Sequence, residues 1–254
     1  MLARASVIDV FIEPRVLPPS TGGAKEVLGR WIARARSVGY DGFIIDLSST
    51  EKTPGFVATL REVQLQAAPF AIFTRKAIVL DDRGGVKARL AGIRGRLGAD
   101  AIYARSGNPE VLNFLAKDGR IDIIRLETLA ELDAFNDGIA SLAGQHGTFI
   151  ELSFAPLVRT RGASRSKYIR ACNKILEICD KHHARLLFSS DADQLVDVKN
   201  AWQKATVLQI LLDASEQQAR EIAIKHPAAL VERCTGTKDD ATVARLDLVE
   251  DDTT

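Results

Sequence analysis

The feature that most constrains the fold of this chain is a regular alternation of strand-like runs with segments of helical periodicity. Between most of the strand-like runs lie segments whose apolar residues recur every three or four positions, which is typical of amphipathic helices. Strands separated by helices pair in parallel, which predicts an α/β fold. The strand-like runs are residues 6–13, 41–49, 70–80, 100–106, 121–127, 148–157 and 185–192.

The length of the chain narrows the choice among α/β folds. The chain has 254 residues, and no Pro- or Gly-rich linker interrupts the alternation. Roughly seven or eight strand–helix units in a single domain, residues 1–236, favour a TIM-like (β/α) barrel. A doubly wound open sheet is the alternative. The segment 237–254 is polar and ends in acids, so we expect a disordered tail there.

The number of cysteines and the hydropathy of the sequence indicate in which cellular compartment the protein is expected. The chain has three cysteines. Cys172 and Cys179 fall on one predicted helix, too far apart for a bridge. An odd count without framework spacing favours a reducing compartment, and we expect a cytoplasmic protein. No apolar run approaches the length of a membrane span, so no membrane partner is expected.

Polar residues at the carboxyl ends of the predicted strands are the candidates for catalysis, because barrel active sites lie at that end. The four histidines all fall outside the strand ends, and no H-x-H, G-x-S-x-G or glycine-rich phosphate motif occurs. We therefore expect no metal, no cofactor and no catalytic residue, and each polar strand end should close its strand or cap the next helix. The candidates are Asp46, Arg75, Arg105, Glu127, Glu151, Ser153, Ser190 and Asp191.

Charge is unevenly distributed, although the net charge is only +1. The segment 157–174 contains no acid, and its cations surround the start of a predicted helix, where each opposes the helix dipole by a few tenths of a kcal/mol. An anionic partner would offset that cost, so we expect phosphate contacts. Tyr168 could stack on a base or lie in the core. The cations are Arg159, Arg161, Arg165, Lys167, Arg170 and Lys174.

A second basic set begins in the third predicted strand and continues into the next predicted helix. Acids are few in this region, although a solvated helix face is the alternative explanation for the helical members. The set comprises Arg75, Lys76, Arg83, Lys87, Arg89, Arg94 and Arg96.

Three stretches, taken in order, resemble ribonuclease P protein component 3, an archaeal family related to a protein subunit of eukaryotic ribonuclease P and RNase MRP. The order of the motifs carries the resemblance, which covers about residues 6–233; the Pro- and Gly-containing stretch 14–23 departs from the family pattern. The stretches are PFAIFTRKAIVL (69–80), FIELSFAPLVRTRGASRSKYIRACNKILEICDKHHARLLFSSDA (149–192) and WQKATVLQILLDASEQQAREIAIKHPAALVER (202–233).

The resemblance implies a barrel related to metal-dependent phosphoesterase barrels but lacking their metal ligands. It implies a subunit of ribonuclease P, the ribonucleoprotein endonuclease that removes the 5′ leader from precursor tRNA, with catalysis carried by the RNA. The implied partners are ribonuclease P RNA, a small ferredoxin-like subunit and other RNase P proteins, with precursor tRNA contacted indirectly. The family's recurrent residues correspond to Thr74, Arg75, Ser153, Pro156, Arg165, Arg170, Ser189, Ser190, Asp191 and Ala192.

Two functional hypotheses follow. One is an RNA-binding scaffold, in which Arg75, Lys76 and the cations of 157–174 contact RNA while Thr74, Ser153, Ser189, Ser190 and Asp191 support the strand ends. The other is a stand-alone barrel hydrolase acting on phosphate esters. The histidine count favours the scaffold. Replacing Asp191 with alanine is then expected to cost about 1 kcal/mol, if this residue caps a helix.

Overall fold

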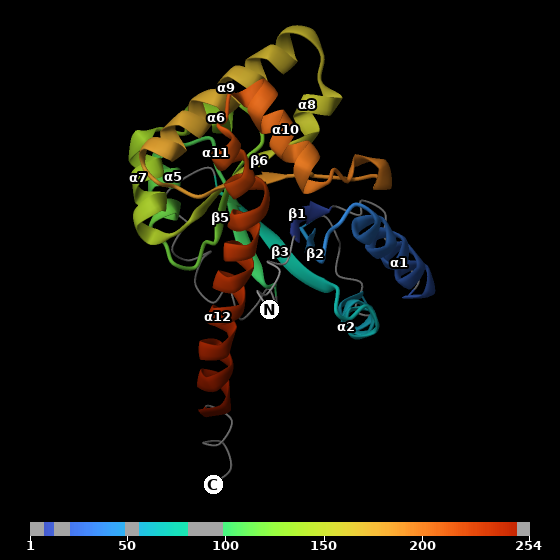
Figure 1. Ribbon diagram of the computed structural model, residues 1–254. Coiled ribbons are helices and arrows are strands. Elements are labelled where there is room, and N and C mark those ends of the chain that lie inside the picture. Colours follow the sequence, from blue (N-terminus) through green and yellow to red (C-terminus); the bar gives the residue numbers. More distant parts are fainter. Residues whose placement is uncertain (1–7, 13–20, 49–55, 81–98, 248–254) are drawn as a thin grey trace.

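The computed structural model describes residues 8–12, 21–48, 56–80 and 99–247 (Figure 1). Its core is one parallel sheet in which every strand pairs with the next strand along the chain. The sheet curls, so that its first and last strands contact each other. The strands are β1 (Ile8–Ile12), β2 (Gly42–Asp46), β3 (Ala71–Val79), β4 (Ala101–Arg105), β5 (Ile123–Leu126), β6 (Phe149–Ser153) and β7 (Leu186–Ser189).

This strand order confirms the prediction of an α/β fold of the TIM-like barrel type. A doubly wound sheet reverses its strand order at a switch point, whereas the order here is sequential from β1 to β7. A curled sheet with sequential order keeps every crossover on one side, so the helices cover the outer face and the inner face is closed off.

Helices follow the strands along most of the chain, and their starts are well specified by the sequence. Side-chain caps begin five of them, through Asn108, Thr128, Asn136, Asn200 and Ser215. The helices are α1 (Thr21–Ser37), α2 (Phe56–Gln66), α5 (Pro109–Ala116), α6 (Leu129–Ala134), α7 (Asp137–His146), α8 (Ala155–Arg159), α9 (Gly162–Lys181), α10 (Ala201–Leu212), α11 (Glu216–Arg220) and α12 (His226–Asp247). None of these described helices is long and apolar enough to cross a membrane.

Two element boundaries differ from the prediction. The run 148–157 was expected to be all strand, but β6 ends at Ser153 and α8 begins at Ala155, because Pro156 suits a first helical turn. The helical run 129–147 is split into α6 and α7, because Asn136 caps the second of them. The helix expected at 85–98 lies outside the described residues.

The strands alternate between two apolar environments. Their outward side chains, such as Ile124 and Ile150, pack beneath the helices in the largest apolar cluster. Inward side chains near the strand starts form a smaller cluster that includes Phe149 and Leu187. Leu230 of α12 joins this inner cluster, so α12 closes the amino-terminal end of the barrel. Polar side chains, described below, fill the carboxyl end of the barrel interior.

The segment 237–254 was expected to be a disordered tail, which stays a prediction, whereas α12 extends as far as Asp247. Leu230 and Cys234 anchor the first half of α12 against the barrel. Once such a helix is nucleated by packing, each further residue adds a hydrogen bond at small cost, so the polar sequence after Gly236 continues as helix. Figure 1 shows this end of α12 projecting away from the barrel. Residues 248–254 lie outside the described residues.

Arg233 binds α12 to the amino-terminal end of the barrel through an ion pair and hydrogen bonds. Its guanidinium lies 3.3 Å from the fully buried Asp122 carboxylate and donates to the carbonyls of His146 and Gly147. Replacing Arg233 with methionine should therefore lower the free energy of unfolding by about 1–3 kcal/mol, because a buried acceptor loses its charged donor. Urea titration should show this loss, while Arg30→Met on the exposed face of α1 should change stability by less than about 0.5 kcal/mol. Equal changes in the free energy of unfolding for the two substitutions would mean that Arg233 does not stabilise the packing of α12 on the barrel.

Candidate nucleic-acid interface

The carboxyl half of the barrel interior holds a network of buried charges contributed by four strands and by Asp191, the second residue after β7. Strand alternation turns Asp46 of β2, Arg75 of β3, Arg125 of β5 and Glu151 of β6 inward. Asp46 is the register partner of Arg75, and Arg125 is the register partner of Glu151. All four are nearly or fully buried, which is costly for charged groups unless they are paired.

Arg75 lies at the centre of this network. Its Nε donates to Asp46 Oδ2 at 3.1 Å, and its Nη1 donates to Glu151 Oε2. The Tyr103 ring lies 4.5 Å from the guanidinium carbon. Burial alone would lower the pKa of Arg75, but the two carboxylates outweigh it and raise the pKa above its usual value. Arg75 is fully buried, which argues against the predicted contact with RNA.

Arg125 is the second buried cation, and it joins Asp191 to the network. Its Nη2 donates to Asp191 Oδ2 at 2.8 Å, and its Nη1 lies 3.7 Å from Glu151. Glu127 at the strand end lies 3.5 Å from its Nε. Burial opposes ionisation of Arg125, yet Glu151, Asp191 and Glu127 together raise its pKa. Likewise burial would raise the pKa of Asp191, but Arg125 and the Ser153 hydroxyl hold it below its usual value.

The strand-end serines complete the network through their hydroxyl groups. Ser153 Oγ donates to Asp191 at 2.7 Å, and Ser189 Oγ donates to Glu151 at 2.7 Å. Ser153 Oγ also accepts the Ala155 N–H at the start of α8. Ser190 is likewise buried. Thr74 supports the start of β4 instead, since its hydroxyl donates to Asp100 at 2.9 Å.

The Asp191 side chain caps neither of the neighbouring helical segments, which was one of the two roles expected of a polar strand end. Its carboxylate faces inward to Arg125 and Ser153, and its backbone is left-handed, with a φ of 48°. Its carbonyl oxygen accepts a bond of 3.2 Å from Arg159 Nη2. The residue therefore ties the buried network to the start of the basic segment through its main chain.

The carboxylates at the carboxyl end of the barrel interior, which we call the barrel mouth, are paired with arginines, and this pairing limits the chemistry that they can perform. Each of the four inner carboxylates, Asp46, Glu127, Glu151 and Asp191, lies against an arginine. Among the described residues, no group of three or more His, Cys, Asp or Glu side chains could hold a metal ion. Burial raises the pKa of Tyr103 to about 12, so its hydroxyl stays protonated near neutral pH. The arrangement is that of a structural ion network.

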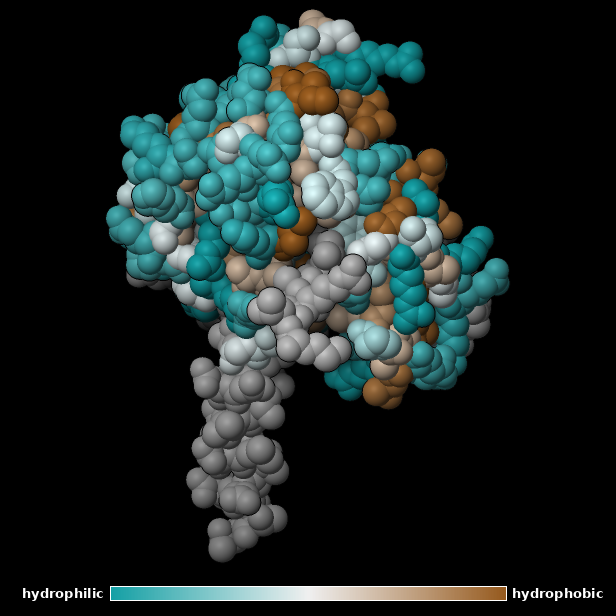
Figure 2. Space-filling view, viewed as in Figure 1, coloured by the Kyte–Doolittle hydropathy of each residue, from teal (hydrophilic) through white to brown (hydrophobic). Residues whose placement is uncertain are grey.

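The basic segment lies on the outside of the barrel, where α8 turns into α9 at the top of Figure 1. Arg161, Lys167, Arg170 and Lys174 are exposed, and none of them forms an ion pair with a described residue. Lys167, Arg170 and Lys174 are spaced by three and four residues, so they form one stripe along α9. We call these four residues the α9 basic face. Figure 2 shows hydrophilic side chains projecting at this end of the molecule.

The remaining two cations of the segment are held by the protein itself. Arg159 lies 2.7 Å from Asp193 and also bonds the Asp191 carbonyl. Arg165 is half-buried, and its Nε donates to the Thr160 carbonyl at 2.9 Å. These two arginines fix the turn between α8 and α9, so less of their charge is directed at a ligand.

Tyr168 belongs to the core. It is buried, and its hydroxyl donates to the Ser153 carbonyl at 2.8 Å. Of the two alternatives left open by the sequence, the structure therefore supports burial. Burial also raises its pKa well above the usual value.

The second basic set is only partly described. Lys76 is half-buried on β3, on the opposite face from Arg75, and its contact with RNA stays a prediction. Arg83, Lys87, Arg89, Arg94 and Arg96 lie outside the described residues.

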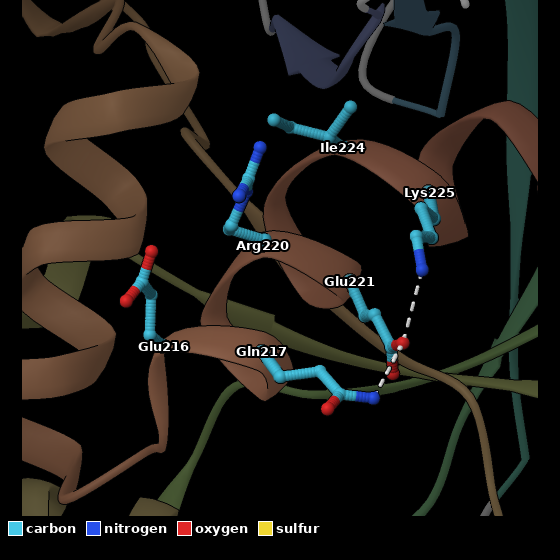
Figure 3. Close-up of a pocket in the computed structure, with 6 residues that line it drawn as sticks. All are labelled: Glu216, Gln217, Arg220, Glu221, Ile224 and Lys225. Carbon is cyan, nitrogen blue, oxygen red and sulfur yellow. Dashed lines mark hydrogen bonds and ion pairs between the residues drawn. The ribbon is translucent and has the colours of Figure 1, made fainter.

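A surface groove lies elsewhere, along α11 and the π-helical turn Glu221–Lys225 (Figure 3). Glu221 accepts from Gln217 at 3.4 Å and from Lys225 at 3.1 Å. The groove thus carries charges of both signs that are partly satisfied within it, which does not match a phosphate site.

Two members of the network escaped the sequence analysis, Arg125 and Tyr103. A signal for Arg125 was present, since it interrupts the apolar run IIRL of β5 at an inward position. The run alone could not show that Glu151 and Asp191, distant in sequence, would meet it. Tyr103 carried no signal that separates it from an ordinary core aromatic.

Comparison with known proteins places the chain in a family. The family model described as RNase P subunit p30 matches residues 7–239. The chain belongs to this family. Its members are protein subunits of ribonuclease P, which confirms the resemblance seen in the sequence.

Relatives of the p30 family show how far the similarity extends. Ribonuclease P protein component 3 of Halobacterium salinarum is 26% identical over 163 residues, or 64% of this chain and 66% of that protein. The protein of the same name from Natronomonas pharaonis is 22% identical, over 84% of this chain and 93% of its own length. A chain in a cryo-EM structure of archaeal ribonuclease P with mature tRNA superposes with a TM-score of 0.71 at 16% identity, covering 89% of this chain and 90% of that one. That likeness confirms the fold.

Proposed function

We propose that this p30-family chain is a non-catalytic subunit of ribonuclease P that binds the RNA component of the enzyme through the α9 basic face. The observation that carries the proposal is the stripe of exposed cations on α9, which no described acid neutralises. Backbone phosphates are the ligand that such a stripe fits, and they dominate the affinity of nucleic-acid binding.

The barrel mouth supports a scaffold more than a hydrolase. A phosphoesterase would need its strand-end carboxylates available to metals or water. Here Asp46 and Glu151 neutralise Arg75, and Asp191 neutralises Arg125. The resemblance to the family implies that the RNA carries the endonuclease activity of the complex, and this chain then contributes binding and orientation.

The partners follow from the family and from the complex in which a chain of the same fold has been solved. One solved structure with the same fold is an archaeal ribonuclease P with mature tRNA. We infer that this chain contacts ribonuclease P RNA directly, precursor tRNA indirectly, and other protein subunits, among which the resemblance to the family implies a small ferredoxin-like one. The three cysteines are free and buried, in keeping with a reducing, cytoplasmic setting.

The test of this function is the salt dependence of binding to ribonuclease P RNA. Arg170→Ala/Lys174→Ala should lower the slope of log affinity against log salt by roughly one to two, since each lost phosphate contact contributes about 0.7–0.9. Arg170 and Lys174 are better targets than Arg165, because both are exposed and neither makes an ion pair with a described residue. The fold should be unaffected, because both side chains point to solvent.

Arg30→Ala/Lys117→Ala is the matched control. It removes two exposed cations from α1 and from the end of α5 and should leave the slope unchanged. An unchanged slope in the Arg170/Lys174 variant would place the RNA contact elsewhere and contradict the proposed function of α9.

A further inference from the structure

The α9 basic face differs from a single-strand binding site in having no aromatic side chain. Proteins that bind single-stranded RNA stack its bases on exposed aromatic rings. Tyr168 is the only aromatic residue between Thr160 and Lys181, and it is buried with its hydroxyl bonded to the Ser153 carbonyl. The face therefore offers no platform for a base.

The exposed ring of Trp202 also fails to provide such a platform. Among the side chains that the structure describes, Trp202 is the one exposed Phe, Tyr or Trp residue, at 65%. It lies at the start of α10, with the Arg220 guanidinium 5.9 Å from its ring. The cation that faces the Trp202 ring is thus Arg220 of α11 and not a member of the α9 basic face.

The shape of the face also favours a double helix. Single strands are held in basic grooves that follow the backbone. The α9 basic face is the outer surface of a helix, and none of its four cations lines the groove of Figure 3 or either of the two smaller hollows nearby. Lys167, Arg170 and Lys174 extend about 10 Å along the helix at 1.5 Å per residue, a straight array that suits a rigid row of phosphates, and Arg161 lies just before the first turn.

Small hydroxyl side chains stand among the cations. Ser164 and Ser166 are exposed in the first turns of α9, beside Lys167. Double-stranded RNA is recognised by its shape and by contacts to phosphates and 2′-hydroxyls across its shallow minor groove. Lysine and arginine flanked by serine supply both kinds of contact without reading a sequence.

We propose that the α9 basic face binds the backbone of double-helical, A-form RNA rather than a single-stranded segment. The inference rests on the proposed function and specifies which form of RNA this surface takes. Contacts to phosphates do not distinguish the two forms of RNA, since both single strands and double helices carry them. The features that favour a double helix are the lack of an aromatic platform, the convex surface and the hydroxyl side chains between the cations.

The experiment measures binding of the full-length chain to an RNA duplex of about 16 base pairs, the length that a double-stranded RNA-binding domain spans. The competitors are each separate strand, chosen to be unstructured, and a DNA duplex of the same sequence. We expect the RNA duplex to bind at least about tenfold more tightly than either strand, and several-fold more tightly than the DNA duplex, which lacks the 2′-hydroxyls. Single strands that bind equally well or better would overturn the inference, and so would equal binding of the DNA duplex.

Variants identify the surface responsible. Lys167→Ala/Arg170→Ala/Lys174→Ala should weaken duplex binding by roughly a hundredfold or more at 0.1 M salt, because each phosphate contact contributes close to tenfold there. Arg30→Ala/Arg61→Ala/Lys117→Ala removes three exposed cations elsewhere and should weaken it less than about threefold. Trp202→Ala should leave it unchanged, whereas a loss in that variant would point to base stacking and contradict the inference.

Binding of the parent chain and the triple variant to ribonuclease P RNA is measured in parallel, because this measurement distinguishes a failure of the duplex inference from a failure of the proposed function. If the triple variant loses that RNA but the isolated duplex is not preferred, the duplex inference fails while the function stands. If the triple variant keeps full affinity for ribonuclease P RNA, the proposed function of α9 itself fails. If the variant instead loses only its association with other RNase P proteins, α9 is a protein interface and both proposals are wrong.

Discussion

Replacing Arg75 with methionine is expected to lower the free energy of unfolding by about 3–5 kcal/mol. The side chain is fully buried between Asp46 and Glu151, and methionine fills most of its volume without supplying a charge. Removing one partner of a buried ion pair leaves the other charge in the interior without compensation, which is the dominant cost. Urea unfolding followed by circular dichroism measures the change.

Two further variants show whether the lost charge is the cause. Arg61→Met, on the exposed face of α2, should change stability by less than about 0.5 kcal/mol. Adding Glu151→Gln to Arg75→Met should recover part of the loss, because one stranded carboxylate is removed. A variant that stays as stable as the parent chain but loses RNA affinity would instead mean that Arg75 contacts RNA, contrary to its burial.

The second large effect is expected at Asp191, where two substitutions separate charge from backbone strain. Asp191→Asn keeps a side chain that tolerates the left-handed backbone but removes the charge facing Arg125, and should cost about 2–3 kcal/mol. Asp191→Ala should cost about 1 kcal/mol more, because alanine adopts a positive φ poorly. Equal losses for the two would show that the backbone conformation contributes nothing.

The pH dependence of the Asp191→Asn effect has a definite sign. Arg125 and Ser153 hold the pKa of Asp191 below its usual value of about 4, despite burial. A carboxylate with a depressed pKa in the folded state stabilises the fold above its unfolded pKa, and this contribution is lost as the pH falls through the folded pKa. The stability difference between the parent chain and Asp191→Asn should therefore be full above about pH 5 and shrink as the pH falls below 4. A difference that grows on acidification would contradict the ionised state assigned to Asp191.

The barrel and the basic segment could be predicted from the sequence because both depend on local patterns. Strand–helix alternation and the caps Asn108 and Ser215 are readable within a few residues. The cations of α9 are likewise contiguous in the chain and surround a helix start, so their exposure followed from the helical period.

The buried network could not be predicted in the same way. Arg75 and Lys76 are adjacent cations in one strand, and alternation requires one to point inward, but only the curl of the sheet decides which. Arg125 and Glu151 meet through a register that no local pattern reveals. For α12 the polar composition after Gly236 indicated disorder, whereas tertiary anchoring by Leu230 and Arg233 carries the helix onward.

Reconstituted cleavage of precursor tRNA tests the central claim most directly. Ribonuclease P RNA and its other protein subunits are assayed for removal of the 5′ leader, with and without this chain, and the chain is also assayed alone with Mg²⁺, Mn²⁺ or Zn²⁺. We predict no turnover by the chain alone, and a cleavage rate at least about tenfold higher when it joins the RNA and the other subunits, as expected from an improved fit of RNA to substrate. Turnover of precursor tRNA or of a simple phosphodiester by the isolated chain, or an unchanged rate when it is left out, would contradict the account.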